Sequence, residues 1–184
     1  MTIIQHKGLQ SNPNMLILNR GGIVKKLFPV LILLLLAACS QPDQESLDAL
    51  YEAFDRNHEK LRTEFEEMYK ESSETSDREE QLKIIYDEML PKIEDFRRTI
   101  HNHTVTGHEH EKFKEDILTY IDSLETLVKL HGEFNRTFIN YNPLGEDEFK
   151  GEIEEIMSEI EVQEKQLDER YETINEKYET LSSS

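Results

Sequence analysis

The feature that most constrains the fold is a repeat of apolar residues at alternating spacings of three and four, found in four stretches between residues 47 and 181. Two such positions in every seven form the narrow apolar stripe along which the helices of a coiled coil pack. The first stretch has seven of them in unbroken register: Leu47, Tyr51, Phe54, His58, Leu61, Phe65 and Met68. This register predicts a helix over about residues 44–71.

Three more stretches follow the same rule and predict helices over about residues 76–101, 108–139 and 146–181. The segments between them are short and contain turn-forming residues, with Gly107 in one and Asn142-Pro143-Leu144-Gly145 in another. Helices joined by short turns pack as antiparallel neighbours. The sequence therefore predicts an all-α domain over residues 46–184, an elongated antiparallel bundle of three to four long helices with coiled-coil-like seams.

Local details are also predicted within these helices. Ser76 and Glu79 have the spacing of a capping box, which would start the second helix. Pro91 lies inside that helix and has no backbone N–H, so we expect a bend there. His58 and His131 occupy seam positions and are expected to be polar core residues; as an alternative, they would form a pH-sensitive pair if the two helices met at that level.

The fourth helix is the longest of the four. We therefore expect its C-terminal turns to extend past the bundle, with part of the apolar seam exposed there. Such an exposed seam would favour a protein partner or a homodimer formed through this helix.

The charge of the chain excludes one large class of functions. Residues 39–184 contain 17 lysines and arginines against 39 acidic residues, a net charge of −22 before histidine is counted. Binding to nucleic acid depends on neutralising phosphates with basic side chains, so no nucleic-acid partner is expected. The acidic surface is interpreted as a solubilising one, with a docking face for a basic partner or for hard cations as the alternative.

The N-terminal part of the chain has a different composition. In the segment Lys25–Ser40, two lysines precede an apolar run, two alanines and Cys39, the only cysteine of the chain. A membrane-spanning helix needs roughly 20 apolar residues, and this run is shorter. The pattern predicts a secretory signal peptide over residues 1–38. The long segment before Lys25 suggests that translation starts at Val24 instead of Met1.

The ending Leu36-Ala37-Ala38-Cys39 resembles the lipobox of bacterial lipoproteins. The resemblance implies cleavage between Ala38 and Cys39 and acylation of Cys39 with palmitate-type chains. It also implies a lipid anchor that holds the mature protein on the extracytoplasmic face of the cell membrane. Residues 39–45 would then be the lipidated cysteine and its tether.

The plan of a lipobox followed by an acidic helical domain resembles small cell-wall-associated lipoproteins of Gram-positive bacteria. The sequence Glu67-Met68-Tyr69-Lys70 also resembles the Glu-Met-Tyr-Tyr motif that names one lipoprotein family, with Lys70 in place of the last tyrosine. These resemblances imply a cell-envelope location and a helical fold, and no chemistry.

A histidine cluster is the one concentrated group of metal-ligand residue types. Four of the seven histidines fall within ten residues, as two His-x-His pairs on either side of a turn: His101, His103, His108 and His110. Imidazole is a good ligand for zinc, copper and nickel, so these residues are candidate metal ligands, with Zn or Cu as the cofactor. The alternative interpretation is that they are polar residues of a helix–helix turn and that the protein has no cofactor.

The sequence contains no nucleophile elbow, phosphate-binding loop or clustered acid pair, so we expect no enzyme activity. The function predicted is a non-enzymatic binding or scaffolding role at the cell envelope, with an envelope protein as partner. The alternative is extracytoplasmic metal binding through the cluster at residues 101–110.

Overall fold

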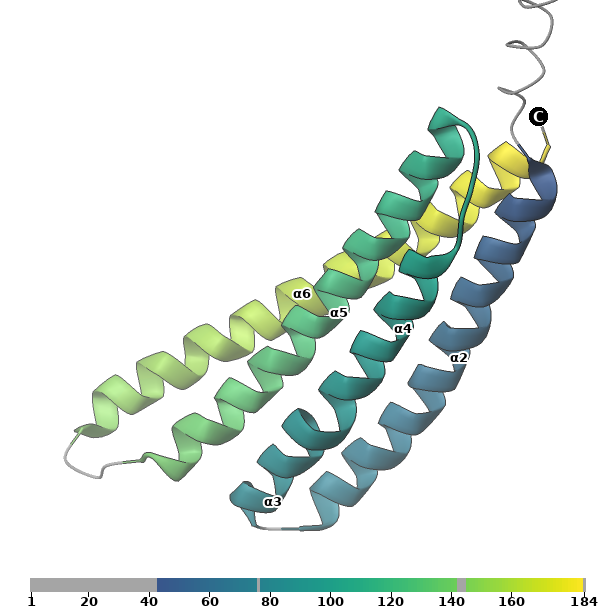
Figure 1. The fold of residues 1–184 in the computed structure, drawn as a ribbon. Helices are drawn as coiled ribbons and strands as arrows, with labels where there is room; N and C mark the ends of the chain where they lie inside the picture. Colours follow the sequence, from purple (N-terminus) through teal and green to yellow (C-terminus); the bar gives the residue numbers. More distant parts are fainter. Residues whose placement is uncertain (1–42, 76, 142–144, 184) are drawn as a thin grey trace, which may run out of the picture. The chain divides into compact units, whose positions relative to one another are not determined.

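The computed structural model describes residues 43–75, 77–141 and 145–183, and residues Gln41–Ser184 form one compact unit. The described part is built from helices (Figure 1). In chain order these are α2 (Gln44–Glu74), α3 (Arg78–Lys83), the π-helical segment η1 (Ile84–Met89), α4 (Leu90–Asn102), α5 (His108–Ile139) and α6 (Glu146–Ser182). The predicted all-α helical bundle is confirmed.

The four helices expected from the apolar repeat are all present. The helix α2 begins at Gln44, two residues before the predicted start of the bundle, and ends three residues later than expected. The second predicted helix consists of α3, η1 and α4, which follow one another without a break in the chain. The helices α5 and α6 match their predicted ranges to within one residue.

The start of α3 differs from the expected capping box by one residue. Asp77 is the N-cap, and its carboxylate accepts hydrogen bonds from the backbone N–H groups of Glu79 and Glu80 at 2.9 and 3.4 Å. Ser76, the expected cap, lies outside the described residues. An aspartate also places a negative charge next to the positive end of the helix dipole, so it serves this position well.

The segment before Pro91 is π-helical. Because proline has no N–H and its ring crowds the carbonyl four residues back, the backbone here cannot keep the ordinary α-helical hydrogen-bond pattern. At Leu90 the N–H instead bonds to the carbonyl of Ile85, five residues back. The wider turn presents Tyr86 to Gly132 of α5, where a Cβ atom would lie 2.7 Å from the tyrosine oxygen. Glycine at position 132 therefore lets η1 and α5 approach closely.

The core runs along the facing stripes of α2, η1, α4 and α5 and takes in the C-terminal half of α6. Phe54 lies at the centre of an aromatic group, with ring centroids 6.0 Å from Phe96, 5.5 Å from Tyr120 and 6.0 Å from Tyr171. These four rings come from α2, α4, α5 and α6, so one buried phenylalanine joins all four helices. Other seam residues that are fully buried include Leu47, Met89, Ile93, Ile100, Phe113, Ile117 and Ile174.

The expectation that the end of the fourth helix extends beyond the bundle is wrong. The C-terminal half of α6 lies against the N-terminal half of α2, where Tyr178 stacks on Tyr51 at 3.7 Å between ring centroids. Hydrogen bonds from the Tyr51 hydroxyl to Asn175 and from the Tyr178 hydroxyl to Asp48 join the same two helices. Large aromatic residues fill the seam here, so this end of α6 packs well, and the apolar side chains left exposed lie elsewhere on the helix.

Charged side chains connect the helices at their surfaces. Arg97 of α4 bonds to Asp122 and Glu125 of α5 at 2.9 and 2.5 Å, and Lys177 of α6 pairs with Asp116 of α5. None of the helices in the described ranges is both long and apolar enough to cross a membrane.

Candidate functional site

The site with the clearest binding geometry is a groove formed by hollows beside the first part of α6. Figure 1 shows that this part of α6 diverges from α2. The ring contacts between these helices end at Tyr171, which stacks on His58 with centroids 4.3 Å apart. Toward its start, α6 continues along α5, and open hollows border it on the α2 side. We call this space, between the C-terminal half of α2, α5 and residues 157–167 of α6, the interhelical groove.

Three adjoining hollows of about 230, 210 and 210 Å³ make up the groove. The first and second share Tyr69, and the second and third share His131 and Phe134, so neighbouring hollows border the same side chains. Residues of α6 line the first and third, whereas the second lies toward α3 and η1. The floor extends along α5 from Leu124 to Phe134, which corresponds to about 15 Å of helix. The apolar side chains that line the three hollows are Leu61, Phe65, Met68, Tyr69, Ile84, Ile85, Met89, Tyr120, Leu124, Phe134, Met157, Ile160 and Leu167.

Several of these apolar side chains are accessible to solvent. Tyr69 on the α2 side has an exposed fraction of 38%, and Met157 on the α6 side has one of 49%. Single exposed apolar residues are ordinary on protein surfaces, whereas a continuous apolar groove between polar borders is typical of a binding site.

The borders of the groove are acidic. Glu66 and Glu161 line it directly, and Glu164 is close enough to raise the pKa values of Tyr69 and His131 by its charge. In the described residues none of these three carboxylates forms an ion pair with a lysine or arginine. Arg62 is the one basic residue that lines the hollows next to α6, and it pairs with Glu59 at 2.7 Å.

The groove contains both seam histidines, but they do not form a pair. His58 lies 5.8 Å from the ring of Tyr120, whereas His131 lies 5.4 Å from the ring of Tyr69. Tyr120 and His131 are eleven positions apart on α5, or about 16 Å along the helix. The predicted alternative of a pH-sensitive pair is therefore wrong, because the two histidines lie at different levels of the bundle.

Burial determines the protonation of the groove's side chains. It lowers the pKa of His58 and of His131 below the usual histidine value, so both rings are neutral at pH 7. Burial also raises the pKa of Tyr69 to about 12, with a smaller contribution from Glu164. The floor is thus uncharged at neutral pH, and the charge of the site lies on its borders.

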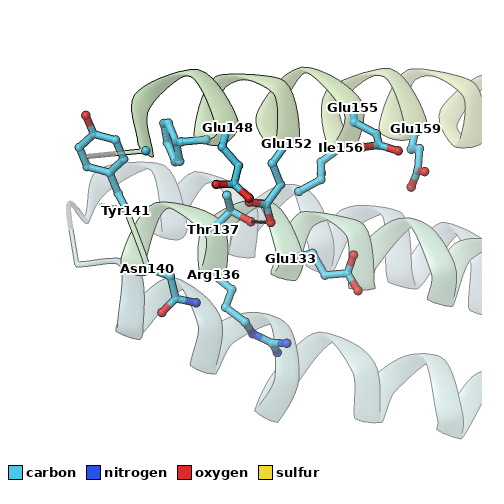
Figure 2. A pocket seen from close by; sticks show the side chains of 12 residues that line it. Glu133, Arg136, Thr137, Asn140, Tyr141, Glu148, Glu152, Glu155, Ile156 and Glu159 are labelled. Carbon is cyan, nitrogen blue, oxygen red and sulfur yellow. Dashed lines mark hydrogen bonds between the residues drawn. The ribbon is translucent and has the colours of Figure 1, made fainter. Parts of the chain in front are cut away.

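A second hollow, of about 530 Å³, lies beside the turn between α5 and α6 (Figure 2). Five glutamates line it, together with Arg136, Asn140 and Tyr141, and the hydroxyl of Thr137 bonds to Glu152 at 3.1 Å. Figure 2 shows Glu152 reaching from α6 toward Thr137 on α5. The hollow is acidic, and its one buried polar side chain already has a hydrogen-bond partner.

The candidate metal ligands lie at the turn between α4 and α5, and they differ in how far their side chains are exposed to solvent. His101 and His108 are exposed, His103 is half-buried, and His110 is buried. Among the described residues no three side chains of the ligand types come together to hold a metal ion. Metal binding through these four histidines stays a prediction from the sequence.

This turn has a structural role of its own. The Nζ atom of Lys114 donates hydrogen bonds to the backbone carbonyls of His101 and His103 at 2.8 and 2.6 Å. These bonds supply partners to carbonyl groups at the end of α4, where the helix itself provides none. Val105 is buried, and the Thr106 hydroxyl accepts a hydrogen bond from the backbone N–H of Asp43 at the start of α2. The turn therefore closes one end of the core.

The predicted cleavage site at Ala38 and Cys39 and the predicted signal peptide lie outside the described residues. The lipid anchor on Cys39 and the localisation to the membrane stay predictions.

A comparison of the chain with protein-family models gave no match, and comparisons with curated proteins and with solved structures gave none either. The proposed function therefore rests on the sequence and on the fold and surface of the described residues.

Sequence reasoning did not identify the interhelical groove. The one signal for it was Gln163, which interrupts the apolar repeat of the fourth helix close to where α6 separates from α2. A single polar residue in a seam does not distinguish a tolerated core position from a point of divergence between helices.

Proposed function

We propose that this protein is a lipoprotein, anchored in the cell membrane through Cys39, that binds an envelope protein on the extracytoplasmic face without enzymatic chemistry. The proposal of the anchor rests on the segment Lys25–Ser40, in which a basic, apolar and small-residue pattern ends at the only cysteine. The proposal of the binding role rests on the interhelical groove.

The observation that carries the binding role is the apolar lining of the adjoining hollows that make up that groove. Burying apolar surface contributes about 25 cal/mol per Å², so a partner that covers the floor gains stability from contact alone. A groove between helices is also the usual receptor for an amphipathic helix of a partner, which places apolar anchors one turn apart along it. A binding module thus accounts for apolar side chains that the bundle itself leaves accessible.

The anchor and the binding role are tested separately in cells. Labelling with an alkyne-bearing palmitate analogue should mark the wild-type protein and leave Cys39→Ser unlabelled and released from the membrane fraction. An unlabelled wild-type protein would refute the anchor.

For the binding role, a photo-crosslinking amino acid is placed at position 157 in the groove. The control position is 162, which is equally exposed and lies on the opposite face of the same helix. A discrete crosslinked partner from position 157 and none from position 162 is expected. Equal crosslinking at both positions would contradict a role for the groove.

A further inference from the structure

We infer that the occupant of the interhelical groove is a basic amphipathic helix, one whose apolar face covers the groove floor and whose lysines or arginines pair with the acidic borders. This inference rests on the proposed binding role and names the chemistry of the partner.

The dimensions fit one helix. The floor follows α5 for about 15 Å, which equals nearly three helical turns. An entering helix would therefore place three or four apolar side chains on the floor, at the i, i+3, i+4, i+7 spacing of helix-in-groove recognition. Among the described elements, the half of α6 nearer its start packs along α5 (Figure 1), so the occupant would lie between α6 and α2 and complete the packing there.

The negative charge of the groove's borders favours a positively charged partner. Residues 146–170 of α6 contain eleven acidic and three basic side chains, a net charge of −8. On the opposite border Glu66 adds a further negative charge. The two basic side chains that line the hollows already have partners, since Arg62 pairs with Glu59 and Arg78 bonds to Gln81 and Asn135. Complementary potentials accelerate association and exclude wrong partners, so lysines and arginines are expected to flank the apolar face of the occupant.

The same charge argues against a second copy of this chain. Two molecules that each carry a net charge of −22 in residues 39–184 would bring their most acidic helices together at such an interface. Like charges across an interface disfavour association. The homodimer predicted through the fourth helix therefore becomes an alternative outcome of the experiment.

The experiment uses residues 41–184, the compact unit that contains the complete core, and a fluorescent 18-residue peptide with leucines on one helical face and lysines on the other. Binding is followed by fluorescence anisotropy. Two comparison peptides isolate the determinants: one replaces every lysine by glutamate, and the other has the same composition in scrambled order, so that it keeps the charge and loses the apolar face. We expect saturable 1:1 binding of the leucine/lysine peptide and at least tenfold weaker binding of the other two.

Two matched variants locate the site. Met157→Asp places a carboxylate on the groove wall and should weaken binding by about tenfold, since an apolar contact is replaced by a charge that must stay hydrated. Val162→Asp adds the same charge on the other face of the helix and should leave binding unchanged. A carboxylate by itself attracts a lysine-rich peptide, so a loss of binding with Met157→Asp cannot come from charge alone. Circular dichroism checks that both variants remain folded.

Four results would overturn the inference: equal binding of the glutamate peptide, equal binding of the scrambled peptide, no effect of Met157→Asp, or sedimentation of residues 41–184 as a dimer that Met157→Asp dissociates. The failure of this inference is distinguishable from failure of the proposed function. If position 157 crosslinks in cells to a partner segment that is not a basic helix, the binding role stands and the assignment of the partner is wrong.

Discussion

Replacement of Ile174 by alanine tests whether the end of α6 is part of the core. The greater length of the fourth helix predicts that these turns project from the bundle, whereas in the structure the side chain of Ile174 is 1% exposed. The two arrangements predict very different costs for the same substitution.

The expected cost follows from the burial of the side chain. Ile174→Ala removes three carbon atoms from the core, at about 0.8 kcal/mol for each in transfer free energy. The cavity left behind adds to this, within the range of about 2–5 kcal/mol seen for such truncations. The higher helix propensity of alanine offsets a few tenths of a kcal/mol of this loss in stability. The free energy of unfolding should therefore fall by about 3 kcal/mol.

Urea denaturation of residues 41–184, followed by circular dichroism, measures this change. With a slope of about 2 kcal/mol per molar urea, the midpoint should fall by about 1.5 M and the slope should stay the same. Val162→Ala is the control on the same helix. Its side chain is 50% exposed, so its midpoint should move by less than about 0.3 M.

A midpoint for Ile174→Ala within about 0.3 M of the wild-type value would refute the reasoning. It would mean that the C-terminal turns of α6 are not held against α2 in solution. The interhelical groove would then lose the boundary that Tyr171 forms at the end where α6 meets α2.

Three further predictions concern pH, an ion-pair network and metal. Burial lowers the pKa of His58, so as the pH falls the unfolded chain binds a proton at this ring before the folded protein does. The free energy of unfolding therefore keeps its full value above pH about 6.5 and declines below it. This decline, measured between pH 7.5 and 5.5, should be smaller in His58→Phe. Arg97→Ala removes a side chain that pairs with three carboxylates, so it should lower the free energy of unfolding in urea by about 1 kcal/mol, and by less in 1 M salt. An equal loss in salt would mean that Arg97 stabilises the fold by packing and not by its charge. Native mass spectrometry of residues 41–184 with zinc should show no tightly held ion, and one ion that is lost when the histidines at 101–110 become alanine would establish the metal site.

The helices could be predicted because the signal for each one is repeated along its length. The apolar repeat from Leu47 to Met68 specifies both the helix and the face that it buries, and an error at one position changes neither. The start of α3 could not be placed to the residue, because Ser76 and Asp77 are both good N-caps and only the backbone geometry chooses between them.

The groove could not be predicted because it depends on the angle between two helices. Met157 and Tyr171 are fourteen residues apart and so occupy equivalent places in a seven-residue repeat, yet Tyr171 packs against the core and Met157 is half exposed. Their difference arises from where α6 separates from α2, which is set by the aromatic contacts of Tyr171 and Tyr178 many residues away. The repeat describes one helix at a time and contains no information on that angle.

The stacking of Tyr51 on Tyr178 also determines the order in which this protein can complete its fold. The hydrogen bonds that join α2 to the end of α6 link residues 124 and 130 positions apart. A chain is synthesised from its N-terminus, and contacts so distant in sequence close slowly. The N-terminal half of α2 is therefore made first and gains its α6 neighbour last. Until then Tyr51 and the surrounding apolar stripe lack that cover, so a nascent chain that stops before about residue 170 would be the form most prone to aggregation and proteolysis.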